Sequence, residues 1–357
     1  MTSSLDPTHE PTRLALNTPH RFYRGGERIL AFRGLPVPED FDGHRPEDWI
    51  ASTTRLFAEG GDGITRLPDG RDLPDVLAAD PTAWLGTEHV AAHGVAPGLL
   101  TKLLDSGERL PVHSHPDRSF AKAHLHCDNG KTEAWIVLAA EPGATVWLGF
   151  REEIDPDTLA ELVEAQDERL LAALNPVQVQ RGDAVLVPGG QPHAIGEGIL
   201  LLELQEPTDL SVMLEHARFG LEEAHAFLGL DRPLALSSVD HGPLTPGALA
   251  GLRSRWTEVR GAGAALPAEA EAYFRAQVVR PTDPSPAASV TAPAAFAVTV
   301  VVEGRGTLAT EHGAASSAPI EIASGDVLLV PHGAGGIRVT GDVTVIRCMP
   351  PAGTTLA

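Results

Sequence analysis

The chain has 357 residues, which is long enough for two or three domains with sizeable cores. It carries 48 acidic against 27 basic residues, a formal net charge of -21, and this argues against binding to nucleic acid or to anionic membranes. Two cysteines give no disulfide framework, and the sequence contains neither a signal peptide nor an apolar run of about 20 residues. We therefore expect a cytoplasmic protein without a nucleic-acid or membrane partner.

The first hundred residues are expected to form short strands and short helices. Residues 21–34 place two apolar segments around Gly25-Gly26, which predicts a β-hairpin. Residues 73–85 predict one or two short helices at the edge of a sheet. The apolar run at 99–104 predicts a strand that is buried on one side.

A pair of histidines follows at residues 113 and 115. In a β-strand, residues i and i+2 point to the same face, so His113 and His115 are expected to aim at one spot. Leu110 and Val112 would face the core, and Pro116 ends the strand. A second His-x-His pair, at residues 124 and 126, lies after this break and is interpreted as surface.

Two more potential ligands come from later strands. Glu133 opens an apparent strand in which Trp135 and Val137 share its face, while Ile136 and Leu138 share the other. His193 follows the segment GDAVLVPGGQP. Three imidazoles and one carboxylate suit a borderline metal ion such as zinc. Each histidine alone would more often be a core residue; it is their combination that predicts a metal site.

The middle of the chain changes its period. Leucines and Val163 repeat at helical spacing over residues 156–174, which predicts a small helical insert. Thr245-Pro246 is typical of a helix start, and a second helix is expected over 267–278. Residues 281–293 have the composition of a linker. Short β-runs separated by glycines occupy residues 296–347 and predict a small all-β barrel or sandwich.

Two segments repeat each other. Residues 182–193 and 325–336 both read G-D-x-x-x-V-P-x-G-x-x, and the last position is His193 in the first copy and Gly336 in the second. Such a repeat suggests duplicated domains. Because Gly336 has no side chain, we expect no metal in the second copy, and an apolar or uncharged centre.

These motifs resemble the cupin family. Gly107, His113 and His115 match its G-x5-H-x-H motif, and residues 182–193 match G-x5-P-x-G-x2-H. The resemblance implies a mainly β protein with two double-stranded β-helix barrels, a helical insert and a helical connection. We expect an N-terminal metal-binding domain over 12–228 with the insert at 155–175, a helical connection over 229–285, and a C-terminal barrel without metal ligands over 286–357.

The position of Glu133, well after the pair His113 and His115, limits the resemblance to one group of cupins. The segments at 113–117 (HSHPD), 130–133 (GKTE) and 187–195 (VPGGQPHAI) are similar to the type I phosphomannose isomerases. The resemblance implies a Zn²⁺ site formed by His113, His115, Glu133 and His193. It also implies that Lys131 is a catalytic or phosphate-contacting residue, where a solvated surface lysine is the plain alternative. The activity implied is interconversion of mannose 6-phosphate and fructose 6-phosphate through an enediolate.

One position departs from the family pattern. The family places an arginine four residues after an acid; here Asp209 is followed by Met213, and the nearest substitute is Arg218. Two alternatives therefore stay open: an isomerase of an unphosphorylated sugar, and a non-catalytic metal-holding protein that binds sugar or regulates. The missing arginine favours the alternatives, whereas Lys131 favours an enzyme whose ligand is a sugar or sugar phosphate.

Overall fold

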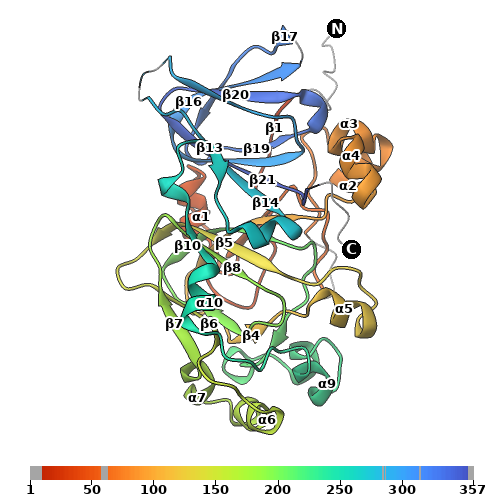
Figure 1. Ribbon diagram of the computed structural model, residues 1–357, viewed down its shortest axis with the longest axis vertical. Coiled ribbons are helices and arrows are strands. Elements are labelled where there is room, and N and C mark those ends of the chain that lie inside the picture. Colours follow the sequence, from red (N-terminus) through yellow and green to blue (C-terminus); the bar gives the residue numbers. More distant parts are fainter. Residues whose placement is uncertain (1–9, 58–62, 284, 286, 313–314, 353–357) are drawn as a thin grey trace.

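The structure is a computed structural model that describes residues 10–57, 63–283, 285, 287–312 and 315–352. It is mainly β and consists of two cupin barrels, the N-terminal one below and the C-terminal one above in Figure 1. The predicted fold class is confirmed. None of the described helices combines the length and the apolarity that crossing a bilayer requires.

The N-terminal barrel contains two antiparallel sheets. The larger has the order β12-β8-β5-β10-β3-β2, and the smaller has the order β11-β4-β9-β6-β7. The strands of the larger sheet are β2 (Glu47–Ile50), β3 (Leu100–Ser106), β5 (Glu133–Ala140), β8 (Asp183–Val187), β10 (Ile199–Gln205) and β12 (Arg253–Arg255). Those of the smaller sheet are β4 (His113–Ser114), β6 (Thr145–Phe150), β7 (Leu174–Gln178), β9 (His193–Ile195) and β11 (Val212–Met213).

The C-terminal barrel is one ten-stranded sheet. Its main order is β1-β19-β16-β21-β14-β13, and the long strand β16 also pairs with β17, β18 and β20. These strands are β1 (Thr12–Arg13), β13 (Gly261–Ala264), β14 (Arg275–Arg280), β15 (Ser289–Ala292), β16 (Ala297–His312), β17 (Ala315–Ser316), β18 (Ile320–Ala323), β19 (Val327–Val330), β20 (Gly336–Thr340) and β21 (Val343–Met349).

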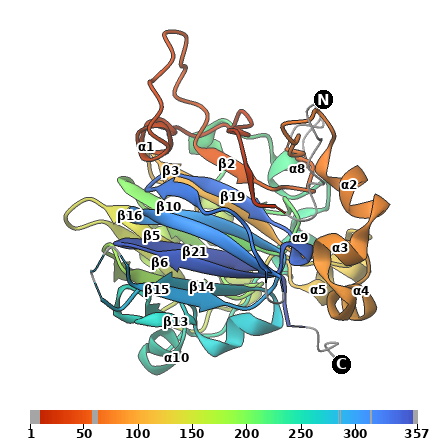
Figure 2. The same ribbon diagram turned by 90° about the horizontal axis from the view of Figure 1, so that it is seen from above.

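The helices cover the ends of the barrels (Figures 1 and 2). They are α1 (Glu27–Phe32), α2 (Leu73–Ala79), α3 (Pro81–Leu85), α4 (Thr87–His93), α5 (Arg118–His124), α6 (Pro156–Ala165), α7 (Glu168–Ala172), α8 (Glu223–Ala226), α9 (Arg232–Leu236) and α10 (Pro246–Gly251), with 3-10 turns η1 (Ala217–Phe219), η2 (Trp256–Glu258), η3 (Ala268–Ala272) and η4 (His332–Ala334). The predicted insert is confirmed by α6 and α7, and Asp155 caps α6 by accepting a hydrogen bond from Thr158 N at 2.9 Å.

The two large sheets pack against each other through one continuous apolar cluster. Ile136 and Leu202 from the N-terminal barrel belong to the same cluster as Val300 and Ile346 from the C-terminal barrel. Because successive side chains of a strand point to opposite faces, the residues between those of this cluster point into the barrel to which the strand belongs. This alternation puts Glu133 and other polar side chains inside.

Three local predictions were wrong. The strand expected at 99–104 is β3, and it is buried along its whole length and not on one side only. Residues 21–34 do not form a hairpin: Gly25 is needed because a Cβ there would lie 1.9 Å from Asp105 O, and α1 begins directly after Gly26. The Asp105 carboxylate accepts from the N–H groups of Gly26 and Arg28 at 2.8 and 2.9 Å, which stabilises the start of the helix. Residues 267–278 form η3 and then β14, because β14 pairs on both sides, with β13 and β21.

The connection between the barrels contains strands as well as helices. Helix α10 begins where predicted, and Thr245 Oγ1 accepts from Ala248 N at 3.3 Å. However, β12 extends the N-terminal sheet, β13 and β14 extend the C-terminal sheet, and β15 lies within the predicted linker. The domain limits at residues 228 and 286 stay a prediction.

Candidate metal centre and pocket

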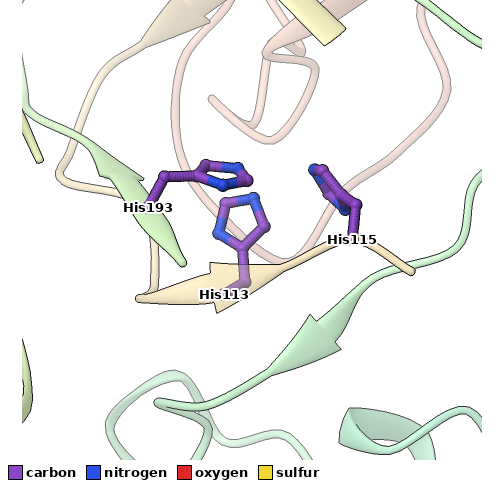
Figure 3. Close-up of side chains that lie close together, drawn as sticks. All are labelled: His113, His115 and His193. Atoms are coloured by element: carbon purple, nitrogen blue, oxygen red, sulfur yellow. The ribbon is translucent and has the colours of Figure 1, made fainter. Parts of the chain in front are cut away.

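Three histidines meet inside the N-terminal barrel (Figure 3). His113 on β4 is the cross-strand partner of His193 on β9, and His115 follows two residues later along the chain. The ring centroids of His113 and His193 are 4.1 Å apart, and those of His115 lie 4.9 and 4.8 Å from the two. The i, i+2 spacing and the strand pairing therefore bring the three predicted imidazoles together.

Backbone carbonyls fix the orientation of each ring. The Nδ1 atoms of His113, His115 and His193 lie 2.8, 2.9 and 2.9 Å from the carbonyl oxygens of Pro111, Leu210 and Gln191. Because a carbonyl only accepts, each Nδ1 carries the hydrogen and donates it. The three Nε2 atoms thus carry a lone pair and no hydrogen, which is the tautomer that binds metal ions.

Glu133 stands at the start of β5 and faces two of these nitrogens. Its Oε2 lies 3.0 Å from His115 Nε2, and its Oε1 lies 3.3 Å from His193 Nε2. Trp135 Nε1 donates to Oε1 at 2.9 Å. All four predicted ligands are buried and adjacent.

The ligand set fits a cation. His193 Nε2 is fully buried and has no hydrogen-bond partner among the described atoms, although a carboxylate oxygen is only 3.3 Å away. Two acceptors that face each other repel unless a positive charge lies between them. The ligand nitrogens of His113, His115 and His193 all lie within 4.8 Å of one another, as a shared metal ion requires.

Lys131 brings a positive charge into this group. Its Nζ lies 2.7 Å from both His115 Nε2 and Glu133 Oε2, and the side chain is buried. Burial opposes ionisation of Glu133, but the Lys131 ammonium outweighs it and holds the pKa of this carboxyl well below its usual value. Burial, together with Lys131, lowers the pKa of His115 to about 3, so its imidazole is neutral.

A small enclosed pocket adjoins the histidines. Lys102 on β3 and Glu203 on β10 line it together with Lys131 and Glu133. Burial, with Glu133 nearby, raises the pKa of Glu203 to about 8, although Lys102 counteracts part of this shift.

A second group of charges in this pocket was not found from the sequence. Arg21 forms a double hydrogen bond with Asp209 at 3.2 and 3.2 Å, and its Nε lies 3.3 Å from Glu47 Oε1. Glu47 also accepts from Tyr23 OH and pairs with Lys102 at 3.4 Å. The residues that pair here are 24 to 188 positions apart in the sequence, and some lie in segments that resemble a hairpin or a loop. The one signal that the sequence offers is the presence of charged residues within otherwise apolar segments.

Arg218 is not brought to this pocket. It lies in η1, is exposed, and stacks its guanidinium at 5.7 Å over the ring of Phe219, whereas Met213 lines the pocket. His124 and His126 are exposed, as predicted. Met213, Arg21 and Asp209 also line an outer cavity of about 750 Å³ that includes Phe57 and is largely apolar.

Comparisons with known proteins agree with this geometry. A mannose-6-phosphate isomerase from Streptococcus mutans is 32% identical over 194 residues, which are 53% of this chain and 56% of that protein. A probable mannose-6-phosphate isomerase from Bacillus subtilis is 27% identical over 222 residues, 61% of this chain and 65% of that protein. The matched segments thus span less than two thirds of either relative. No protein-family profile matches the chain.

Solved structures extend the likeness to the whole fold. A putative mannosephosphate isomerase from Archaeoglobus fulgidus superimposes with a TM-score of 0.71 at 16% identity, over 98% of this chain and all of that one. The mannose 6-phosphate isomerase from Bacillus subtilis gives a TM-score of 0.71 at 19% identity, over 95% and 99% of the two chains. The predicted resemblance is therefore confirmed: this chain is related in sequence to the type I phosphomannose isomerases and shares their fold.

Proposed function

We propose that the protein is a zinc-dependent aldose–ketose isomerase that interconverts mannose 6-phosphate and fructose 6-phosphate. The observation that carries the proposal is the set of three buried imidazoles whose Nε2 lone pairs, together with the Glu133 carboxylate, face one point beside an enclosed pocket. The mannose-6-phosphate isomerases among the relatives support the substrate.

His113, His115, Glu133 and His193 would hold the metal ion. A zinc ion bound there would withdraw electron density from neighbouring hydroxyl and carbonyl oxygens and stabilise developing negative charge. The donor set of three nitrogens and one carboxylate oxygen suits zinc better than magnesium or calcium, which prefer oxygen ligands.

The reaction moves one proton from C2 to C1 and one hydroxyl proton between the two oxygens, through an enediolate. We assign Lys131 to proton transfer at a sugar oxygen, because its ammonium is buried beside the ligands at 2.7 Å from His115 Nε2 and Glu133 Oε2. Burial of the whole group excludes water and strengthens each of these charge interactions.

One observation favours a second candidate, an isomerase of an unphosphorylated sugar. Three Lys or Arg side chains line the pocket, and each is already paired with a carboxylate: Arg21 with Asp209, Lys102 with Glu47 and Lys131 with Glu133. With Met213 uncharged, the described lining leaves no free cation for a phosphate group.

An assay across matched substrates tests both candidates. Zinc-loaded protein should convert mannose 6-phosphate, and removal of the metal by a chelator should abolish the conversion. Conversion of mannose without conversion of mannose 6-phosphate would support the second candidate. If zinc is bound and the fold is intact but neither sugar is converted, the isomerase proposal is refuted and a sugar-binding role replaces it.

A further inference from the structure

The two barrels match strand by strand. The repeated segments contain β8 and β19, and the neighbours of these two strands in the sheets follow the same order: β5 and β16, then β10 and β21, then β3 and β14. The residue pairing carries this match to single positions. Trp135 pairs with Val185 and Glu203, and Thr299 pairs with Leu328 and Arg347.

This register puts an arginine where the N-terminal barrel has an acid. Glu203 pairs across the strands with Trp135 and Lys102, and Arg347 pairs in the same way with Thr299 and Gln277. Both side chains point into their barrels. The prediction of an uncharged centre for the second barrel was therefore wrong, since Arg347 is completely buried there.

Arg347 has no acidic partner among the described residues. Its Nη1 donates to Gln277 Oε1 and its Nη2 to Pro293 O, each at 2.9 Å, while its buried Nε meets no partner in the part of the chain that the structure describes. The same holds for the buried Thr299 hydroxyl beside it. A buried guanidinium without a counter-charge is strongly unfavourable, so this arrangement calls for an anion.

A second arginine lies close by. Arg275, two residues before Gln277 on β14, is half-buried, and its one hydrogen bond to a described residue runs from Nε to Pro350 O at 2.9 Å. It too forms no ion pair within the described ranges. Burial and the positive charge of Arg275 together lower the pKa of Arg347 to about 10, which shows that the two guanidinium groups repel each other.

A cavity of about 340 Å³ opens at this point. Arg275, Gln277 and His89 of α4 are among the residues that line it. Helix α4 follows α3 directly along the chain, and both lie beside the C-terminal barrel (Figure 1). Because Gln277 Oε1 accepts from Arg347, its amide N–H donors are free for a ligand. His89 Nε2 donates to Ala96 O at 2.8 Å, so its buried Nδ1 carries a lone pair that has no partner among the described atoms. The described lining contains one acid, Glu88, which is exposed.

We infer that the C-terminal barrel binds a small oxyanion, a phosphate or carboxylate group, in the cavity at Arg275 and Gln277. Arg347 provides positive charge from beneath the cavity, and the Arg275 guanidinium and the Gln277 amide bind the oxyanion. The cavity shares no lining residue with the metal-site pocket. This second site is thus independent of the proposed isomerase activity.

Calorimetric titration with inorganic phosphate, and separately with glycerate, tests the inference at constant ionic strength. We expect one saturable site per chain for at least one of these anions, in the zinc-loaded protein and equally in His193→Ala. Arg275→Gln should weaken binding at least tenfold. The matched control Arg338→Gln removes an exposed guanidinium of the same barrel that pairs with Glu311, and it should leave binding unchanged. Phosphate and glycerate distinguish the two oxyanion classes.

A second variant separates loss of anion binding from loss of folding. Arg347→Met fills the same space without charge, so its melting temperature should no longer rise with the anion, whereas that of the natural protein should. The inference is overturned if neither anion binds saturably, if Arg275→Gln binds as the natural protein does, or if His193→Ala abolishes binding, because the anion would then occupy the metal site.

Discussion

Loss of one imidazole should separate metal binding from folding. His193 is fully buried on β9, and its Nε2 faces the shared point with no hydrogen-bond partner among the described atoms. His193→Ala removes one nitrogen ligand and leaves His113, His115 and Glu133. The variant also loses the hydrogen bond from Nδ1 to Gln191 O and the packing of the ring against Trp135, but the backbone pairing of β9 with β4 and β6 stays, so the barrel should still fold.

The magnitude follows from the ligand set. Loss of a residue that merely orients a ligand lowers metal affinity about 10–100-fold, so loss of a ligand itself should lower it by at least 100-fold, or about 2.7 kcal/mol. Competition with a chromogenic zinc chelator measures this constant, and elemental analysis after dialysis measures the retained metal. We expect about one zinc per chain in the natural protein and almost none in His193→Ala.

The control comes from the second His-x-His pair. His124 is exposed at the end of α5, so His124→Ala should keep the zinc affinity of the natural protein within about twofold. Equal zinc retention in His193→Ala and His124→Ala, with circular dichroism unchanged, would remove His193 from the metal centre. Loss of zinc in both variants would place the ion elsewhere.

Three further predictions concern the pocket. Lys131→Met should keep the zinc but lower the turnover of the substrate about 10²–10⁴-fold, as expected for loss of a proton-transfer group; unchanged turnover would show that Lys131 takes no part in the reaction. Arg218→Ala should change turnover less than about twofold, because this arginine is exposed outside the pocket; a loss of orders of magnitude would show that it reaches the substrate. Glu47→Gln should lower the free energy of unfolding by about 3–5 kcal/mol in urea titrations, since Arg21 and Lys102 lose a buried counter-charge, whereas the exposed Glu258→Gln should change it by less than about 1 kcal/mol.

The same carboxylate gives a pH dependence with a definite sign. Burial opposes ionisation of Glu47, but Arg21 and Lys102 outweigh it and hold its pKa well below the usual value. A depressed folded-state pKa stabilises the fold above the unfolded pKa of about 4.3, and this stabilisation disappears as the pH falls toward the folded value. The natural protein should therefore lose more unfolding free energy between pH 6 and pH 3 than Glu47→Gln; parallel curves would refute this assignment.

The metal ligands could be predicted because strand geometry is local. His113 and His115 share a face by the period of two, and the duplicated turn motif places His193 at the start of a strand. Glu133 was harder, since the two-residue period fixes its face but not its partner strand. The pairing of β4 with β9 and of β5 with β10 supplies what the local pattern lacks.

The pocket charges could not be predicted, because they depend on long-range register. Arg21 meets Asp209 across 188 residues, and it lies in a segment whose Gly25-Gly26 pair resembles a hairpin turn. There the glycines serve a close backbone approach to Asp105, which the sequence alone cannot distinguish from a turn. The same limit made residues 267–278 look helical.

Arg347 shows how much a duplicated scaffold leaves open. The repeat predicted two like strands, and Gly336 in place of His193 predicted a second copy without that ligand. However, a barrel without metal ligands need not have an uncharged centre, because the position equivalent to Glu203 can hold an acidic or a basic residue. In the N-terminal barrel an acid at this position accompanies residues suited to a cation, and in the C-terminal barrel an arginine accompanies unpaired donors. The sheet thus fixes where a buried charge stands, and the side chain at that register decides which ligand charge the barrel can bind.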